Sequence, residues 1–159
     1  MANNDFEHAR DFALRYLGYA PRSRKQLRDK LMQNGFLPES IAATMELFEQ
    51  KGYVDDVAFA ASYISSKSRT NSYGKRRIVM GLLQNGVAKE DIVSAYNYVF
   101  EDGEAENELD SCKRALAKKI SNKDTAAIFN NPKEKQRIVA FLLRRGFSYE
   151  IVKKALASK

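Results

Sequence analysis

The chain has 159 residues, of which 44% are hydrophobic and 30% are charged, a composition typical of a soluble globular protein. Its longest apolar run, residues 138–143, is too short to span a bilayer. One cysteine, Cys112, and one histidine, His8, exclude an internal disulfide and a multi-cysteine or histidine-rich metal centre. The net charge of +7 favours an anionic partner such as nucleic acid, although many soluble domains carry such a charge without a ligand.

The first third of the chain predicts three helices. Residues 6–17 carry apolar side chains at helical spacing. In the next stretch Leu27 and Leu31 lie one helical turn apart, and Gly35 follows where a helix needs a left-handed residue after its C-terminus. Pro38 suits the first position of a third helix. This stretch therefore predicts a three-helix unit.

The same arrangement recurs twice. A predicted helix at 56–67 precedes a second pair of helices joined at Gly86, and a predicted helix at 104–120 precedes a third pair joined at Gly146. The last helix carries Ile151 and follows a turn that we expect to be one residue shorter than in the other copies. The middle helices repeat the apolar pair of the first copy, as Ile78 with Leu82 and as Ile138 with Leu142.

Polar residues mark the expected helix starts. Ser23 and Gln26 have the spacing of a capping box, in which each side chain satisfies a free backbone amide. Asp55 is placed to cap the helix at 56–67, and Asn131 is placed to cap a helix that begins at Pro132. These signals indicate the same helix boundaries as the apolar periodicity.

We therefore predict an all-α fold of three tandem three-helix repeats forming an elongated, curved array. The expected repeats are 1–53, 54–102 and 103–159, with a linker near 121–131. No run of alternating β-branched residues predicts a strand. Because about 45 residues are too few for a secure core, each repeat must be stabilised partly by its neighbours.

The sequence argues against an enzyme, a cofactor or a metal site. Gly74–Lys75 resembles the end of a phosphate-binding loop, but Arg69 stands where that loop needs glycine. Asp55–Asp56 fits a helix cap better than a pair of catalytic carboxylates, because adjacent residues point in different directions. Cys112 lies on an apolar stripe, and His8 is not placed to activate it.

The middle helix of every repeat is basic, whereas acids gather at 101–110. The candidate partner-binding residues are Arg22, Arg24, Lys25, Arg28, Lys75, Arg76, Arg77, Lys135, Arg137, Arg144 and Arg145. Equivalent basic helices in a tandem array would follow a long polyanion or a repetitive acidic surface. The alternative is a set of solvated helix faces. Tyr73 beside these cations has two interpretations, stacking on a ligand or packing at a helix start.

Four motifs in chain order resemble those of the RecX family, regulators of the RecA recombinase. The first contains Arg22, Ser23, Leu27, Leu31, Gly35 and Phe36. The second is the stretch 52–60, and the fourth is the stretch 141–147. The third contains Gly74, Arg77, Ile78, Leu82, Gly86 and Val87. The resemblance covers residues 10–156, with Lys67 where members often have arginine and a C-terminus soon after the ninth helix.

The resemblance implies a cytoplasmic, non-enzymatic monomer built of three three-helix repeats. Such proteins bind RecA and its filament on single-stranded DNA, lodge in the filament groove and restrain recombinase and coprotease activity. The first ten residues lack the apolar stretch of a signal peptide, which agrees with a cytoplasmic protein that has no membrane partner. Two alternatives remain: a helical module that binds DNA weakly and without sequence preference, and a helical scaffold for another protein.

Overall fold

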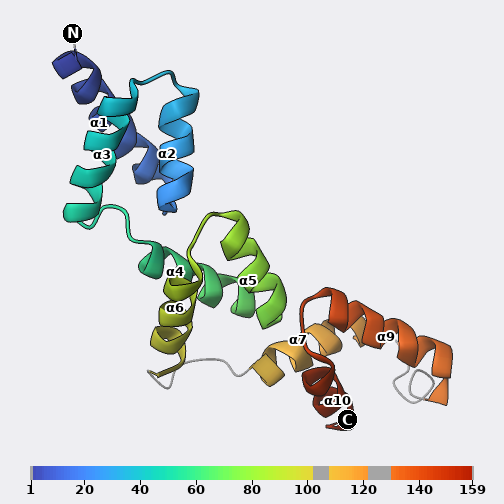
Figure 1. Cartoon of the computed structure of the whole chain (residues 1–159). Helices are drawn as coiled ribbons and strands as arrows, with labels where there is room; N and C mark the ends of the chain where they lie inside the picture. Colours follow the sequence, from blue (N-terminus) through green and yellow to red (C-terminus); the bar gives the residue numbers. More distant parts are fainter. Residues whose placement is uncertain (1, 102–107, 122–129, 159) are drawn as a thin grey trace. The chain divides into compact units, whose positions relative to one another are not determined.

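The computed structural model describes residues 2–101, 108–121 and 130–158, and Figure 1 shows their helices. The nine helices of these residues are α1 (Ala2–Tyr19), α2 (Arg24–Gln33), α3 (Pro38–Gln50), α4 (Asp56–Arg69), α5 (Lys75–Gln84), α6 (Lys89–Glu101), α7 (Glu108–Ile120), α9 (Pro132–Arg144) and α10 (Tyr149–Ala157). The described ranges contain no strand, which confirms the all-α tandem fold. None of the helices in these ranges combines the length and the apolar character that crossing a membrane requires. Most of the predicted linker, and residues 102–107 of the acidic segment, lie outside the described residues.

The predicted caps are present at three helix starts. The Ser23 hydroxyl accepts a hydrogen bond from the Gln26 amide at 3.2 Å, and the Gln26 side chain accepts one from the Ser23 amide at 3.0 Å. Asp55 accepts from two amides in the first turn of α4, at 2.8 and 3.0 Å. The Asn131 side chain caps α9, whose first residue is Pro132. The sequence predicted these caps because each one joins residues only two or three positions apart.

All three middle helices, α2, α5 and α9, end in the same glycine turn. Gly35 and Gly86 have φ of +78°, and Gly146 has φ of +92°, the left-handed conformation predicted for them. In each turn the amide after the glycine donates to a carbonyl five residues back. These bonds are Phe36 to Leu31 (3.5 Å), Val87 to Leu82 (3.1 Å) and Phe147 to Leu142 (3.4 Å). The turn is a Schellman motif repeated three times.

The expected shorter turn in the third repeat is wrong. The helices α3, α6 and α10 each begin three residues after the glycine of their turn. Ser148 is the N-cap of α10, and its hydroxyl accepts from the Ile151 amide at 3.3 Å. Val152, which is fully buried, therefore takes the buried position of Ile41 and Ile92, and Ile151 is only half-buried. Two adjacent apolar residues left the sequence pattern ambiguous by one position.

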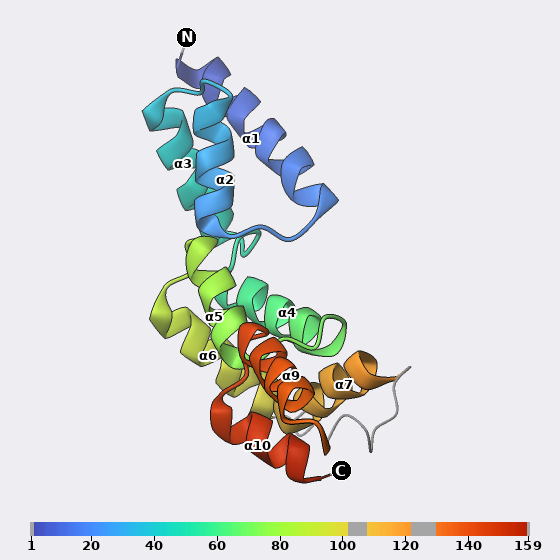
Figure 2. The same cartoon turned by 90° about the vertical axis from the view of Figure 1, so that its right-hand side faces the viewer.

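The described helices form two compact units that do not follow the predicted repeat boundaries. The N-terminal unit consists of Met1–Ala61 and Leu82–Ala95, and the C-terminal unit consists of Ser62–Gly81 and Tyr96–Lys159. The second predicted repeat is thus divided between them. In Figure 2, α1, α2 and α3 form one three-helix group, and α7, α9 and α10 form another. The repeat boundaries themselves stay a prediction.

Each unit has its own apolar core. In the N-terminal unit, the apolar pair of α2 packs with Phe48 of α3 and with Ala9 and Ala13 of α1. In the C-terminal unit, the apolar pair of α9 packs with helices α7 and α10, and Phe147 is fully buried there. The apolar positions predicted for these helices are therefore core positions.

In the N-terminal unit, the start of α2 is seated on the glycine turn of α5. The Ser23 hydroxyl donates to the Asn85 carbonyl at 2.5 Å, and the Gln26 amide group donates to the Asn85 side chain at 2.7 Å. A Cβ added to Gly86 would lie 2.5 Å from Cβ of Lys25. Glycine is therefore needed here for its left-handed backbone and also for the close approach of α2.

In the C-terminal unit, the start of α5 is seated on the glycine turn of α9 in the equivalent way. The Gly74 amide donates to the Arg145 carbonyl at 2.8 Å, and the Arg76 amide donates to the Gly146 carbonyl at 3.2 Å. A Cβ on Gly74 would overlap the backbone of residues 146 and 147. The C-terminal carbonyls of one helix thus pair with the N-terminal amides of the next.

Two glycine substitutions distinguish the stability that comes from the close approach of α5 to α9 from the stability that comes from the left-handed glycine of the turn. A Cβ on Gly35 meets no atom within 4 Å, so we expect Gly35→Ala to cost about 1–2 kcal/mol for the left-handed backbone alone. A Cβ on Gly146 would lie 2.5 Å from the backbone nitrogen of Arg77, so Gly146→Ala should cost about 1–3 kcal/mol more. Urea unfolding measures both losses. Equal losses would contradict a tight seating of α5 on α9.

Candidate functional site

Arg24, the first residue of α2, makes side-chain and backbone hydrogen bonds within the fold. Its guanidinium makes two hydrogen bonds to the Glu49 carboxylate, at 2.9 and 2.7 Å. Its backbone amide donates to the Asp56 carboxylate at 2.8 Å. Asp56, in the first turn of α4, thereby also caps α2. Because the two residues are 32 positions apart, no local sequence pattern predicts this contact.

The other predicted cations of the N-terminal unit differ in their surroundings. The Arg22 guanidinium lies over the Tyr16 ring, 4.9 Å from its centroid. Lys25 forms an ion pair with Asp29 at 2.5 Å. Arg28 is exposed and takes part in none of these contacts. Among the four predicted residues here, Arg28 is the one whose charge is most available to a partner.

At the start of α5 the three adjacent cations also differ. The Lys75 ammonium lies 4.8 Å from the centroid of the Tyr96 ring. The Arg77 guanidinium lies over Tyr73 at 4.1 Å. Arg76 is exposed, and only its backbone amide is used, in the seating of α5 on α9. Arg76 therefore presents its side chain to solvent from a fixed backbone position.

Arg145 at the end of α9 ties the α4–α5 connection to α9. Its guanidinium donates to the Ser72 carbonyl at 3.2 Å and also to the Asn71 carbonyl. It also lies 5.0 Å from the Tyr73 ring centroid. Tyr73 is thus contacted by the guanidinium groups of both Arg77 and Arg145, which favours its packing interpretation over stacking on a ligand.

The remaining predicted residues of α9 are surface residues. Arg137 forms an ion pair with Glu134 one turn earlier. Lys135 and Arg144 are exposed. At the junction between α5 and α9, the Arg76 amide bonds to Gly146 and the Arg144 carbonyl accepts from Arg77 at 3.5 Å. Lys135 lies more than two helical turns before Arg144 on α9. The partner-binding role of all these residues stays a prediction.

At the start of each basic helix, two backbone amides are already bonded within the fold. At α2 they pair with Ser23 and Asp56, and at α9 they pair with Asn131. At α5 the Lys75 amide donates to the Glu108 carboxylate at 3.0 Å. A helix N-terminus binds an anion through such amides when they are free. A phosphate or carboxylate partner would therefore be bound here by side chains.

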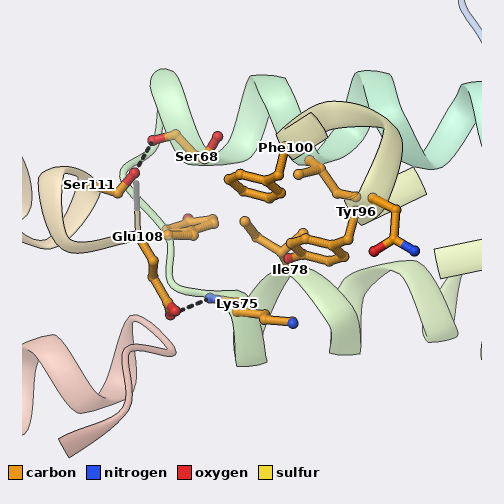
Figure 3. Close-up of a pocket in the computed structure, with 10 residues that line it drawn as sticks. Ser68, Lys75, Ile78, Tyr96, Phe100, Glu108 and Ser111 are labelled. Carbon is orange, nitrogen blue, oxygen red and sulfur yellow. Dashed lines mark hydrogen bonds between the residues drawn. The ribbon is translucent and has the colours of Figure 1, made fainter. Parts of the chain in front are cut away.

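A cavity of about 300 Å³ in the C-terminal unit was not foreseen from the sequence (Figure 3). It is lined by Ile64, Ser68, Tyr73, Lys75, Ile78, Tyr96, Asn97, Phe100, Glu108 and Ser111. The Tyr96 ring stacks on Phe100, and its buried hydroxyl has no hydrogen-bond partner among the residues that the structure describes. Burial raises the pKa of Tyr96, so this hydroxyl stays neutral. Residues from α4 to α7 meet only in the fold, so no single motif marks the cavity.

The metal-ligating and nucleophilic residue types of the described ranges are placed as follows. Within the ranges 2–101, 108–121 and 130–158, no three His, Cys, Asp or Glu side chains are grouped to hold a metal ion. Cys112 is fully buried as predicted, and burial raises its thiol pKa to about 11, so the nucleophilic thiolate is suppressed at neutral pH. Asp55 is occupied as a helix cap.

Comparison with known proteins agrees with this architecture. The first, second and third three-helix domains of RecX match residues 9–46, 55–95 and 106–156, in that order. The chain belongs to the RecX family. Its RecX relatives carry the name of regulatory proteins rather than of enzymes.

Two relatives and two solved structures illustrate the similarity. The regulatory protein RecX of Pelodictyon phaeoclathratiforme is 33% identical over 98% of this chain and 91% of its own length. That of Bacillus licheniformis is 30% identical over 91% of this chain, which spans about half of that longer relative (52%). A crystal structure of RecX from Lactobacillus salivarius shares the fold, with a TM-score of 0.77, 21% identity and coverage of 98% and 97%. A second RecX crystal structure gives a TM-score of 0.79 at 22% identity, over 96% of this chain and 73% of that one.

The hydrogen bond from the Arg24 amide to Asp56, which positions α2, can be tested by substitution of Asp56. Burial raises the pKa of this carboxyl above 3.8, and the hydrogen bond from the Arg24 amide offsets only part of that rise. A raised carboxyl pKa means that the folded state loses stability as the pH rises from 3.8 through the higher folded-state value. Asp56→Asn keeps an acceptor for the amide and does not ionise.

We therefore expect the stability of Asp56→Asn relative to wild type to increase as the pH rises from below 3.8 through the raised pKa of the folded state. Urea unfolding at a series of pH values measures this difference. Asp56→Ala, which loses the acceptor and also does not ionise, should be less stable than Asp56→Asn at every pH by about 1 kcal/mol. A difference between Asp56→Asn and wild type that does not change with pH would contradict the raised pKa.

Proposed function

We propose that this RecX family member binds RecA and the RecA filament on single-stranded DNA, lodges in the filament groove, and restrains recombinase and coprotease activity. It acts as a cytoplasmic monomer without a cofactor, in homologous recombination, DNA repair and the SOS response. The observation that supports this most directly is the match of all three RecX domains, in order, to a chain whose middle helices carry cations.

The exposed cations are the residues that we assign to the contact. Arg28, Arg76, Lys135 and Arg144 are solvent-exposed and occur on all three middle helices. Arg22, Arg24 and Arg145 have partners within the fold and serve mainly to hold it. A RecA–DNA filament offers both acidic protein groups and phosphates, and exposed guanidinium groups bind either.

Sequence-independent DNA binding alone is the second candidate, favoured by the net charge of +7. A sequence-specific reader would need base-reading side chains at the start of a recognition helix. The third helices of the repeats begin with acids instead, at Glu39, Glu90 and Glu150. Weak contact with phosphates is therefore the most that we expect of this protein on naked DNA.

Charge reversal on two middle helices tests the assignment. We expect Arg28→Glu with Arg76→Glu to weaken binding to RecA assembled on single-stranded DNA by about tenfold or more, because two attractions become repulsions. Co-sedimentation measures the affinity, and strand exchange and ATP hydrolysis report the inhibition. Arg15→Glu on α1, also exposed, is the matched control and should bind normally. Unchanged binding of the double variant would favour a scaffold for another protein.

A salt titration separates the filament from naked DNA. On naked single strands, the logarithm of affinity should fall by about 0.7 per neutralised phosphate for each unit of log salt. We expect binding to the filament to be tighter and less sensitive to salt, because protein contacts add to the phosphate contacts. Equal affinity and equal salt dependence on both would support the DNA-binding module.

A further inference from the structure

An exposed apolar side chain occupies one equivalent position in all three middle helices. Met32 of α2, Leu83 of α5 and Leu143 of α9 each lie three residues before the glycine of their turn. Their side chains are 60%, 41% and 39% exposed. We call these three residues the apolar knobs. The same exposed position is thus apolar in every repeat.

The glycine turn uses the backbone carbonyl of each knob. The glycine amide of each turn donates to the carbonyl of the knob, at 3.0 Å in all three copies. The apolar contact of the turn is supplied instead by the preceding leucines, which are fully buried: Leu31, Leu82 and Leu142. A polar residue at the knob position would leave the turn intact. The turn itself therefore does not explain why the position is apolar.

In α2 and α5, an exposed cation shares the helix face of the knob. Arg28 precedes Met32 by four residues, so the two side chains lie on one face of α2. Arg76 precedes Leu83 by seven residues, two helical turns, and the exposed Met80 lies between them. Arg144 directly follows Leu143. Each middle helix thus combines an apolar knob with exposed positive charge.

This combination fits a protein surface better than a nucleic acid. Phosphates attract the cations but gain nothing from an aliphatic side chain, and proteins that bind single strands use aromatic rings on which bases stack. Methionine and leucine offer no such ring. Burial of an aliphatic side chain in an apolar hollow is favourable, and acids around the hollow would pair with the neighbouring arginines.

We propose that the apolar knobs are the anchor residues of a protein interface, one in each repeat, and that each enters an acid-rimmed apolar hollow on an equivalent subunit of the partner. The inference rests on the proposed function, in which that partner is the RecA filament, a repeating assembly of one subunit. The cations then contribute attraction and orientation, and the knobs contribute the buried contact.

The test combines a knob variant with a matched control. The knob variant is Met32→Gln, Leu83→Gln and Leu143→Gln, which keeps good helix formers at exposed positions. The control variant is Val93→Gln, Tyr98→Gln and Tyr149→Gln, whose side chains on α6 and α10 are 59%, 64% and 61% exposed. Circular dichroism and thermal melting establish that both variants fold. Binding is measured to RecA assembled on single-stranded DNA and, separately, to naked single-stranded DNA.

We expect the knob variant to bind the filament about a hundredfold more weakly than wild type, since three buried aliphatic contacts are lost. Its binding to naked DNA and the binding of the control variant to the filament should be unchanged.

Filament binding by the knob variant at wild-type strength would overturn the inference and leave the proposed function standing. An equal loss on naked DNA would also overturn it, because the knobs would then contact nucleic acid. A wild-type chain that does not bind the filament would overturn the proposed function and this inference together.

Discussion

The seating of one middle helix on the glycine turn of the next is the contact on which the rest of this structure depends. At both junctions the start of a helix approaches so closely that a single methyl group on Gly74, Gly86 or Gly146 would overlap its neighbour. Hydrogen bonds from Ser23 and from the Gly74 amide then satisfy carbonyls at the end of the facing helix. Helix ends that would otherwise need water or caps thus satisfy one another. Within each unit, this contact therefore joins helices of two different RecX three-helix domains.

The same seating explains why the basic residues of the middle helices have two different roles, some structural and some exposed to solvent. Near the junctions, arginine is a structural residue: Arg145 ties down the α4–α5 connection, and Arg77 rests on the Tyr73 ring. Arg76, between these contacts, keeps its side chain in solvent. Arginine suits both tasks, because its planar group donates to several carbonyls at once and still carries its charge. A count of basic residues therefore overstates the charge that is available to a partner.

The exposed apolar knobs add a second component to that surface. Charge alone would speed association with any polyanion, but it discriminates poorly between DNA and a protein–DNA filament. An aliphatic side chain placed at the same position in three repeats favours a partner that presents a protein surface. The turn allows this placement, because it uses the carbonyl of the knob and leaves 39–60% of each knob residue exposed.

The sequence by itself determined the helices, their caps, the three glycine turns and the family, because each depends on residues a few positions apart or on motifs in fixed order. It misjudged the turn at Ser148 by one residue, since Ile151 and Val152 fit the apolar pattern equally well until packing selects one. It also could not distinguish Arg145, held by backbone carbonyls, from Arg144, which faces solvent. Only the tertiary structure decided these points, together with the cap from Asp56 to α2 and the cavity beside Tyr96. The physical reason is that such contacts join residues far apart in the chain, and their energies depend on distances that no local pattern records.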